Sequence, residues 1–330
     1  MSRTIAQRTL GASGPLVSEL GLGCMGMSGM YGPTDRAESI ATIHAALDAG
    51  INLIDTGDFY GMGHNEMLIG EALQGRREQA VLSVKFGAMR APSGQFIGFD
   101  GRPNAVRNFV AYTLQRLRVD YIDIYRPSRI DPAVPIEETI GAVADLIRAG
   151  YVRYAGLSEV GAETIRRAQR THPICDLQIE YSLVSRGIER AILPAVRDLG
   201  IGVTAYGVFS RGLLSGSRPQ GRGDFRAYLP RFQQGNLEQN GKLQATLAEM
   251  AAERGLTAAQ LAFAWVRTKG QDIVPVIGAK TRAQLAGVIE ALDVPLSEEE
   301  VRRLEEAVPA GAVAGDRYTA EQMAILDSEK

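Results

Sequence analysis

Three side chains that can exchange or hold protons occur in two short apolar segments. The segment LIDTGDFYG (residues 53–61) contains Asp55 and, five residues later, Tyr60, and the next apolar run, VLSVKFG (81–87), contains Lys85. An ammonium group beside a phenol stabilises the phenolate, so we expect Lys85 to lower the pKa of Tyr60. Asp55 is expected to keep Lys85 charged and in place. This combination predicts a proton donor tuned towards neutral pH, which suits carbonyl reduction.

The elements that must position these residues alternate along the chain. Helices are predicted over 36–50, 104–117 and 136–150, and several of the helical segments end in glycine, a common helix stop. In residues 136–150 the apolar side chains recur at spacings of three and four, which places them on one helical face. The predicted strands cover residues 19–23, 51–55, 80–84, 121–125, 152–158, 177–181, 202–206 and 272–278.

Eight strands that alternate with helices indicate parallel pairing and right-handed crossovers. The number eight favours a closed (β/α)8 TIM barrel over an open sheet. We predict a single domain over residues 1–330, because the sequence shows no linker, low-complexity tract or repeat. Two additions are expected: a long functional loop at 217–236 after the seventh strand, and an extra C-terminal helix at 297–307. Ser297 and Glu300 form the capping box of that helix.

A glycine motif in the first strand suggests a different fold. Gly21, Gly23 and Gly26 match the G-x-G-x-x-G fingerprint of Rossmann dinucleotide-binding domains. That fingerprint opens a helix directly, whereas residues 27–33 read as a loop, and Asp55 comes later than the expected spacing of about 20 residues. We therefore expect the glycines to let a loop pass close to a bound ligand.

The bulk composition excludes several classes of protein. The chain has 330 residues, 45% of them hydrophobic, and a net charge of -2 with a pI of about 6.0, which indicates no surface for nucleic acid or anionic membranes. No apolar run approaches the ~20 residues that span a bilayer. The first 14 residues lack the apolar core of a secretory signal. Cys24 and Cys175 make no disulfide framework, so we expect a cytoplasmic protein.

The chain contains, in this order, the segments GLGCMGMS (21–28), DTGDFYG (55–61), GHNEMLIGEAL (63–73), SVKFG (83–87), VDYIDIY (119–125), GYVRYAGLSE (150–159), DLQIEYSLVSR (176–186) and AYGVFSRGLLSG (205–216). Taken together, these segments resemble the aldo-keto reductase family over nearly the whole chain. The resemblance implies a (β/α)8 barrel that binds NADP(H) without a Rossmann fold and carries its active site at the C-terminal mouth. It also implies that Tyr60 protonates the carbonyl oxygen as hydride reaches the carbon, supported by Lys85 and Asp55.

One catalytic position departs from the family pattern. The family has a histidine at the end of the fourth strand, and in YRPSRID (125–131) Ser128 stands in its place. A serine hydroxyl donates a hydrogen bond, but it neither becomes a cation nor titrates near neutral pH. Losing one positioned polar group costs about 2.7–4 kcal/mol of barrier. We therefore expect a working but weakened or specialised reductase in which Ser128 replaces part of the hydrogen bonding.

The resemblance further implies where the nicotinamide binds. Tyr206 would stack on the nicotinamide ring, and Ser158 and Gln178 would bond its carboxamide. Glu159 stands where many relatives have asparagine, and a carboxylate accepts hydrogen bonds but donates none.

The phosphates of the cofactor are expected on the following loops. Lys280 and Arg282 lie beside the start of the helix after the eighth strand and would hold a 2′-phosphate, which favours NADPH over NADH. Phe209, Arg211 and Gly212 would wrap the pyrophosphate. The full predicted cofactor site comprises Gly23, Met25, Ser158, Glu159, Gln178, Tyr206, Phe209, Arg211, Gly212, Gly278, Lys280, Arg282 and Gln284.

The predicted substrate is a small carbonyl compound with an apolar body, and aromatic aldehydes are the first candidates. Methionines and aromatic residues on the loops suit an apolar, adaptable pocket. The expected pocket residues are Met25, Met27, Met30, Tyr31, Phe86, Met89 and the loop at 217–236. Alcohol oxidation is the same chemistry in reverse.

A different class of function is the alternative. The chain would then be an NADP(H)-binding regulatory or interaction subunit with little turnover, as in the potassium-channel β-subunits that resemble the same family. Ser128 in place of the histidine fits a protein that is no longer selected for catalysis. The retention of Asp55, Tyr60 and Lys85 favours an enzyme. Asp58 is expected to be solvated rather than catalytic. No metal site is predicted.

Overall fold

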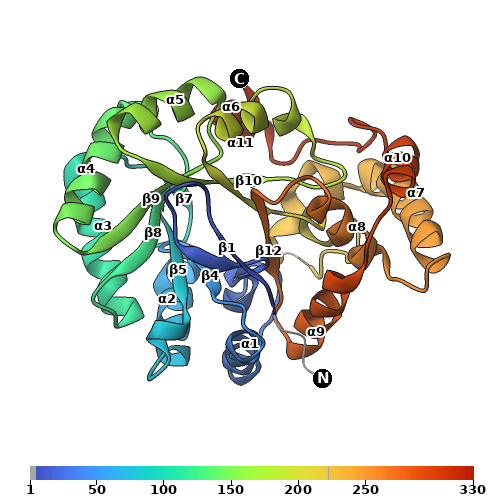
Figure 1. The fold of residues 1–330 in the computed structure, drawn as a ribbon, viewed down its shortest axis with the longest axis horizontal. Coiled ribbons are helices and arrows are strands. Elements are labelled where there is room, and N and C mark those ends of the chain that lie inside the picture. The colour runs from blue at the N-terminus through green and yellow to red at the C-terminus, as the bar shows by residue number, and fades with distance from the viewer. Residues whose placement is uncertain (1–4, 222) are drawn as a thin grey trace.

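Among residues 5–221 and 223–330, which the computed structural model of the chain describes, eight parallel strands close into a barrel (Figure 1). β12 pairs with β3 to complete the ring, so the predicted (β/α)8 TIM barrel is confirmed. In order around the ring the strands are β3 (Gly21–Gly23), β4 (Leu53–Gly57), β5 (Val81–Phe86), β8 (Ile122–Pro127), β9 (Val152–Ser158), β10 (Ile174–Glu180), β11 (Gly202–Tyr206) and β12 (Ile273–Gly278).

Helices connect the strands and cover the outside of the barrel (Figure 1). Polar side chains fix several helix starts: Asp35 accepts from the Glu38 N–H, and the predicted capping box of Ser297 and Glu300 is confirmed. The helices are α1 (Arg36–Asp48), α2 (His64–Ala72), α3 (Pro103–Leu117), α4 (Ile136–Arg148), α5 (Ala162–Thr171), α6 (Ile192–Asp198), α7 (Gln234–Ala252), α8 (Ala258–Arg267), α9 (Arg282–Glu290), α10 (Glu298–Ala307) and α11 (Ala320–Ala324).

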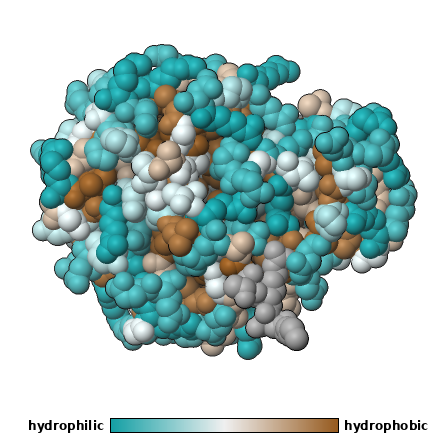
Figure 2. Space-filling model, viewed as in Figure 1, coloured by the Kyte–Doolittle hydropathy of each residue, from teal (hydrophilic) through white to brown (hydrophobic). Residues whose placement is uncertain are grey.

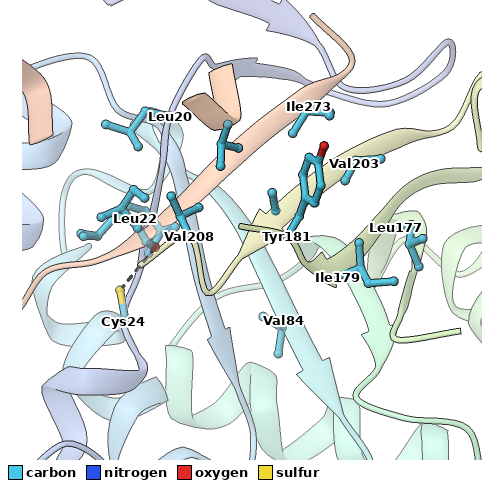
Figure 3. Packing of buried hydrophobic residues seen from close by; sticks show 14 of the residues in the cluster. Leu20, Leu22, Cys24, Val84, Leu177, Ile179, Tyr181, Val203, Val208 and Ile273 are labelled. Atoms are coloured by element: carbon cyan, nitrogen blue, oxygen red, sulfur yellow. Dashed lines mark hydrogen bonds between the residues drawn. The ribbon is translucent and has the colours of Figure 1, made fainter. Parts of the chain in front are cut away.

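Successive side chains of a strand point to opposite faces, and the barrel uses the two faces differently. Outward residues such as Val84, Leu177 and Val203 belong to the main hydrophobic core of the chain (Figure 3). Leu22 and Cys24 lie two residues apart on one face of the first barrel segment. On the face shown in Figure 2, hydrophilic residues cover most of the surface and hydrophobic residues appear as separate patches.

Inside the barrel, the inward-facing side chains change from apolar to polar along the barrel axis. At one end a small apolar cluster contains Leu53, Ile124 and Val276. The hairpin of β1 (Gln7–Thr9) and β2 (Leu16–Ser18) closes that end with Leu10 and Val17, which join the same cluster. Further along the same strands, the inward positions turn polar and charged. That polar end is the C-terminal mouth.

Close packing inside the barrel explains one glycine of the Rossmann-like motif. A Cβ at Gly21 would lie 2.9 Å from Leu53 Cδ2, closer than real side-chain contacts allow. Gly26 lies in a 3-10 turn, Met25–Ser28, and no helix opens there. The glycines therefore serve barrel packing and a loop, and the Rossmann alternative is excluded.

The observed elements differ from the predicted ones mainly at their ends. The strand expected at 51–55 is Leu53–Gly57, so Asp55 lies in the middle of its strand and not at the end. Lys85 lies inside β5, one residue before the end of that strand. The long loop at 217–236 contains short 3-10 turns, Phe225–Tyr228 and Pro230–Phe232, and α7 begins inside it. Residues 1–4 of the N-terminal segment and Arg222 of this loop lie outside the described residues.

Two additional segments lie near the mouth. A hairpin of β6 (Ala88–Arg90) and β7 (Phe96–Phe99) follows β5. The C-terminal segment, residues 309–330, leaves α10 and runs across to α11 beside α6, as the red trace in Figure 1 shows. The Asp327 carboxylate accepts from the Gly161 N–H at the start of α5, which fixes the end of this segment. In the described part of the chain, no helix is long and apolar enough to cross a membrane.

Candidate active site

The strand register brings the predicted proton-handling residues to one level of the barrel. Gly23 pairs with Asp55, Asp55 pairs with Ser83, and Lys85 lies two residues further along β5, on the same inward face as Ser83. Because neighbouring strands are hydrogen-bonded in parallel, residues far apart in the sequence meet inside the barrel.

Asp55 is the centre of the first cluster, which is called the substrate-side cluster because it contains the predicted proton-handling residues. Its carboxylate accepts from Lys85 Nζ at 2.5 Å, from Ser83 Oγ at 2.8 Å and from Gln178 Nε2 at 2.7 Å. Gln178 comes from β10, on the far side of the ring from β4, so this hydrogen bond spans the barrel. Arg126 Nη2, from β8, donates to Ser83 Oγ at 3.0 Å. Asp55 and Lys85 are therefore fixed on several sides.

Tyr60 lies on a tight turn directly after β4. Gly61 and Met62 both have left-handed backbone angles, with φ of 57° and 54°, a conformation that costs energy for Met62. The turn holds the Tyr60 ring 5.3 Å from Lys85 Nζ, and Phe59 packs edge-on at 4.7 Å. The structure thus brings together Asp55, Lys85 and Tyr60, with Tyr60 only 6% exposed.

The direction of the Tyr60 pKa shift is opposite to the prediction. Burial raises the pKa of Tyr60 well above its usual value, and the nearby Asp55 charge raises it further. Burial also lowers the pKa of Lys85, although Asp55 opposes that effect. Lys85 is paired with Asp55 at 2.5 Å, and the negative charge of Asp55 offsets part of the effect of Lys85 on the phenol. Burial therefore outweighs the expected effect of Lys85.

Ser128 and Arg129 follow β8 at the mouth. Ser128 is 2% exposed, and its Oγ has no hydrogen-bond partner among the described residues. Its backbone N–H donates to the Phe86 carbonyl oxygen at 2.8 Å, which holds the residue at the end of the barrel. A buried hydroxyl without a partner is costly and calls for an explanation, and a bound ligand would supply one.

Glu159 is the centre of a second cluster, which contains the predicted cofactor residue Tyr206 and is called the cofactor-side cluster after that prediction. It has a left-handed φ of 52° and is fully buried. Its carboxylate accepts from both Nη atoms of Arg317, at 3.0 and 2.8 Å, from Tyr206 Oη at 2.7 Å and from Ser328 Oγ at 2.7 Å. Burial alone would raise the pKa of Glu159, but the Arg317 ion pair and these donors hold it well below its ordinary value. A residue that only accepts hydrogen bonds matches this set of donors.

A directional chain of hydrogen bonds joins Arg129 to this cluster. Arg129 Nη2 lies 3.0 Å from Tyr318 Oη, which lies 3.0 Å from Tyr206 Oη, which lies 2.7 Å from Glu159. Arginine only donates and carboxylate only accepts, so each hydroxyl in between donates towards Glu159. Tyr318, from the C-terminal segment, thereby connects the loop after β8 to the predicted nicotinamide residue Tyr206.

Arg211, predicted for the pyrophosphate, is already paired. Its Nη1 lies 3.1 Å from the buried Glu180 carboxylate, and its guanidinium stacks over the Tyr318 ring at 4.5 Å. Arg231 and Arg317 approach the same carboxylate at 3.3 and 3.6 Å.

The residues predicted for the 2′-phosphate lie at the start of α9. Lys280 Nζ donates to the Tyr31 and Pro33 carbonyl oxygens at 3.1 and 3.3 Å, and Arg282 pairs with Glu38 at 2.9 Å. Gln284 accepts from the Lys280 N–H at 2.8 Å. The other predicted cofactor residues lie at the ends of barrel strands or on the loops that follow them: Gly23, Met25, Ser158, Phe209, Gly212 and Gly278.

Not every expected position matches the structure. Met27 and Phe86 are core residues rather than pocket lining, and Phe86 stacks on Tyr125 at 4.3 Å. Asp58 is not solvated: its Oδ1 is buried without a partner among the described residues, and its Oδ2 accepts from the Gly87 N–H at 3.3 Å. The loop after β4 folds this side chain back towards β5.

Sequence reasoning missed several residues of the two clusters. Ser83 and Arg126 carry a signal in the sequence, because they lie two residues from Lys85 and Ser128 on inward strand faces. Arg129 lies beside Ser128 but belongs to no predicted site. Arg317 and Tyr318 carry no local signal, since they follow the barrel in an irregular segment.

Comparison with known proteins gives consistent matches. The model of the aldo/keto reductase family matches residues 19–309. A probable aldo-keto reductase 1 from Glycine max is 42% identical over 315 residues, covering 94% of this chain and 90% of that protein. The solved structure of a glycerol dehydrogenase from Gluconobacter oxydans has a TM-score of 0.82 at 30% identity, covering 93% of this chain and 95% of that one. An aldo/keto reductase from Klebsiella pneumoniae, solved in complex with NADP and acetate, has a TM-score of 0.71 at 27% identity, covering 92% and 95%.

Proposed function

The chain belongs to the aldo-keto reductase family, and from this membership we propose that it reduces an aldehyde or ketone to the alcohol with NADPH, Tyr60 supplying the proton. It is an oxidoreductase of a family that uses NADP(H). The observation that carries the proposal is the cluster in which Lys85 contacts Asp55 and lies 5.3 Å from the centre of the Tyr60 ring.

The raised pKa of Tyr60 suits a proton donor. At neutral pH the phenol keeps its proton, and it gives that proton up only when the carbonyl oxygen becomes alkoxide-like and strongly basic. The phenolate left behind then forms beside the Lys85 ammonium, which stabilises it electrostatically. Asp55, Ser83 and Gln178 hold Lys85 and its counter-charge in place during the transfer.

Ser128 would orient the carbonyl group. Its buried hydroxyl has a free hydrogen for the carbonyl oxygen, at the position where the family has histidine. It cannot share proton transfer in the way that an imidazole does, so Tyr60 alone would supply the proton.

The cofactor side also fits the proposal. Ser158 Oγ is buried and lacks a partner in the described part of the chain, and such a group fits the nicotinamide carboxamide. Tyr206 would pack on the ring, and Lys280 and Arg282 at the start of α9 would hold the 2′-phosphate. Bound NADPH supplies the hydride.

Loss of NADPH absorbance with a panel of aromatic and aliphatic aldehydes and ketones tests the proposal. Tyr60→Phe removes the proton but keeps the ring, so we expect reduction to fall about 10²- to 10⁴-fold while NADPH binding persists. Tyr112→Phe, at a residue 58% exposed on the surface, is the matched control and should keep the wild-type rate.

Two outcomes would contradict the proposal. Equal rates for wild type and Tyr60→Phe would remove Tyr60 as the proton donor. Tight NADPH binding without consumption of any carbonyl compound would favour the alternative, a regulatory or interaction subunit.

A further inference from the structure

Arg129 differs from the cations nearest to it in its partners. Its Nη atoms donate to the Ser128 carbonyl oxygen at 2.5 Å and to Tyr318 Oη at 3.0 Å, both neutral groups. Within the described residues, no carboxylate forms an ion pair with it. Four cations around it are paired with carboxylates: Lys85 with Asp55, Arg211 and Arg231 with Glu180, and Arg317 with Glu159. Lys280, on the far side of the mouth, also donates only to carbonyl oxygens.

Among the described residues, no carboxylate directly contacts the Arg129 guanidinium. Glu159 acts on it through space, but Arg317 already neutralises that carboxylate in a bidentate contact. Burial withdraws this guanidinium from water, and the described residues give it two neutral hydrogen-bond acceptors but no carboxylate in direct contact. Its planar fork of N–H donors matches the oxygens of a carboxylate or phosphate.

The position of Arg129 assigns it to the substrate rather than to the phosphates of the cofactor. Arg129 follows β8, which lies across the barrel from β12. The residues expected to hold the 2′-phosphate follow β12, so they lie on the opposite side of the mouth. Arg129 is adjacent to Ser128, whose buried hydroxyl lacks a partner within the described chain, and its positive charge acts on Tyr60. Ser128 and Arg129 thus present a hydroxyl donor and a cation side by side, next to the proposed proton donor.

We propose that Arg129 binds an anionic group, a carboxylate or a phosphate, on the carbonyl substrate while Ser128 contacts the carbonyl oxygen. The inference rests on the proposed reductase function and names its substrate class: aldehydes or ketones that carry a negative charge. Such a group supplies the directly contacting anion that Arg129 lacks among the described residues. The apolar body predicted for the substrate would lie between the two polar ends.

Matched substrates test the charge preference directly. We would compare kcat/KM for 4-carboxybenzaldehyde, 4-formylphenyl phosphate and the neutral isostere 4-carbamoylbenzaldehyde, with NADPH, in wild type and Arg129→Met. A charge-assisted hydrogen-bonded contact predicts a preference of about 10- to 100-fold for at least one anionic substrate in wild type. Arg129→Met should reduce that ratio to about twofold or less. The ratio of the two anionic compounds then separates carboxylate from phosphate recognition.

Three further variants make the test specific. Arg129→Lys keeps the charge but loses the fork, so an intermediate ratio is expected. Tyr318→Phe removes the hydroxyl partner of Arg129 and keeps the guanidinium, so the charge preference should persist even if the rates change. Arg166→Met removes an exposed surface charge and should leave the ratio as in wild type. If Arg129→Met does not fold, the Arg129→Lys ratio decides.

The outcomes separate this inference from the proposed function. Consumption of the neutral and anionic aldehydes at equal kcat/KM would overturn the anion site and leave the reductase proposal intact. A preference that survives Arg129→Met, or a loss of NADPH affinity in that variant without a change in the ratio, would also overturn it. No consumption of any of the three compounds would count against the reductase itself.

Discussion

The two carboxylate clusters of the mouth are built from different parts of the chain. On the substrate side, Asp55 accepts hydrogen bonds from Lys85, Ser83 and Gln178, all of which lie on barrel strands. On the cofactor side, Glu159 accepts from Tyr206 on a barrel strand but also from Arg317 and Ser328 in the C-terminal segment. Arg317 is 158 residues away from Glu159 in the sequence.

The difference shows two ways in which the fold neutralises a buried carboxylate. In each cluster a buried carboxylate is balanced by one cation and several neutral donors, as burial of a charge requires. The substrate-side cation, Lys85, lies on barrel strand β5, so the barrel itself holds it beside Asp55. The cofactor-side cation lies beyond α10, past the end of the family match at residue 309, and depends on the C-terminal segment staying in place.

The largest expected effect comes from removing the cofactor-side cation. Arg317→Met leaves Glu159 buried without its ion pair, and we expect the free energy of unfolding to fall by about 3–5 kcal/mol. Urea denaturation measures the change. Arg303→Met breaks an exposed pair with Glu253 instead, and should cost less than about 1 kcal/mol.

A double-mutant cycle with Glu159→Gln shows whether this loss belongs to the pair. Most of the stability should return in the double variant, because the amide introduced by Glu159→Gln carries no charge to be left unpaired. If Arg317→Met cost no more than Arg303→Met, the C-terminal segment would not hold Glu159, and the comparison between the two clusters would fail.

An intermediate effect is expected at Asp58, a buried carboxyl near the substrate side that forms no ion pair among the described residues. Burial raises the pKa of Asp58 to about 7, and the neighbouring Glu66 charge contributes to that rise. The folded state therefore holds this proton more tightly than the unfolded chain, so stability is full below about pH 4 and is lost as pH rises through 7. Asp58→Asn should remove this loss and gain about 1–3 kcal/mol at pH 8 relative to its effect at pH 5.

Urea denaturation of both proteins at pH 5, 6 and 8 checks this pH dependence. The side-chain oxygen of the introduced asparagine can still accept from the Gly87 N–H, so the loop should keep its conformation. A gain that is the same at all three pH values would show that Asp58 does not titrate in this range.

The smallest effects are expected at two buried hydroxyls without a partner among the described residues, Ser128 on the substrate side and Ser158 on the cofactor side. Ser128→Ala should lower kcat about fivefold with little change in NADPH KM, whereas Ser158→Ala should raise NADPH KM by a similar factor. Both substitutions remove a buried hydroxyl that lacks a partner in the described structure, so both should raise stability by about 1 kcal/mol. Steady-state kinetics and thermal unfolding separate the two effects.

The assignment of sides can fail in a definite way. A change in NADPH KM from Ser128→Ala, or a change confined to kcat from Ser158→Ala, would show that the substrate and cofactor positions are exchanged.

The barrel and the substrate-side cluster were readable in the sequence because they depend on local patterns. Alternating strands and helices predict parallel pairing, and the inward alternation along β5 places Ser83 and Lys85 on one face. The cofactor side was less readable. Glu159 stands out in the sequence as a departure from the family pattern, but nothing near it identifies its partner, since Arg317 and Tyr318 lie in an irregular segment without periodicity.

The sequence by itself determined which strand residues meet at the mouth, because strand order, register and side-chain alternation follow from local patterns. The tertiary structure decided how those residues behave. Burial of Tyr60 reverses the expected direction of its pKa shift, and the C-terminal segment supplies the cation that Glu159 requires. Both depend on solvent exclusion and on distances between charges far apart in the chain, and these quantities exist only once the chain has folded.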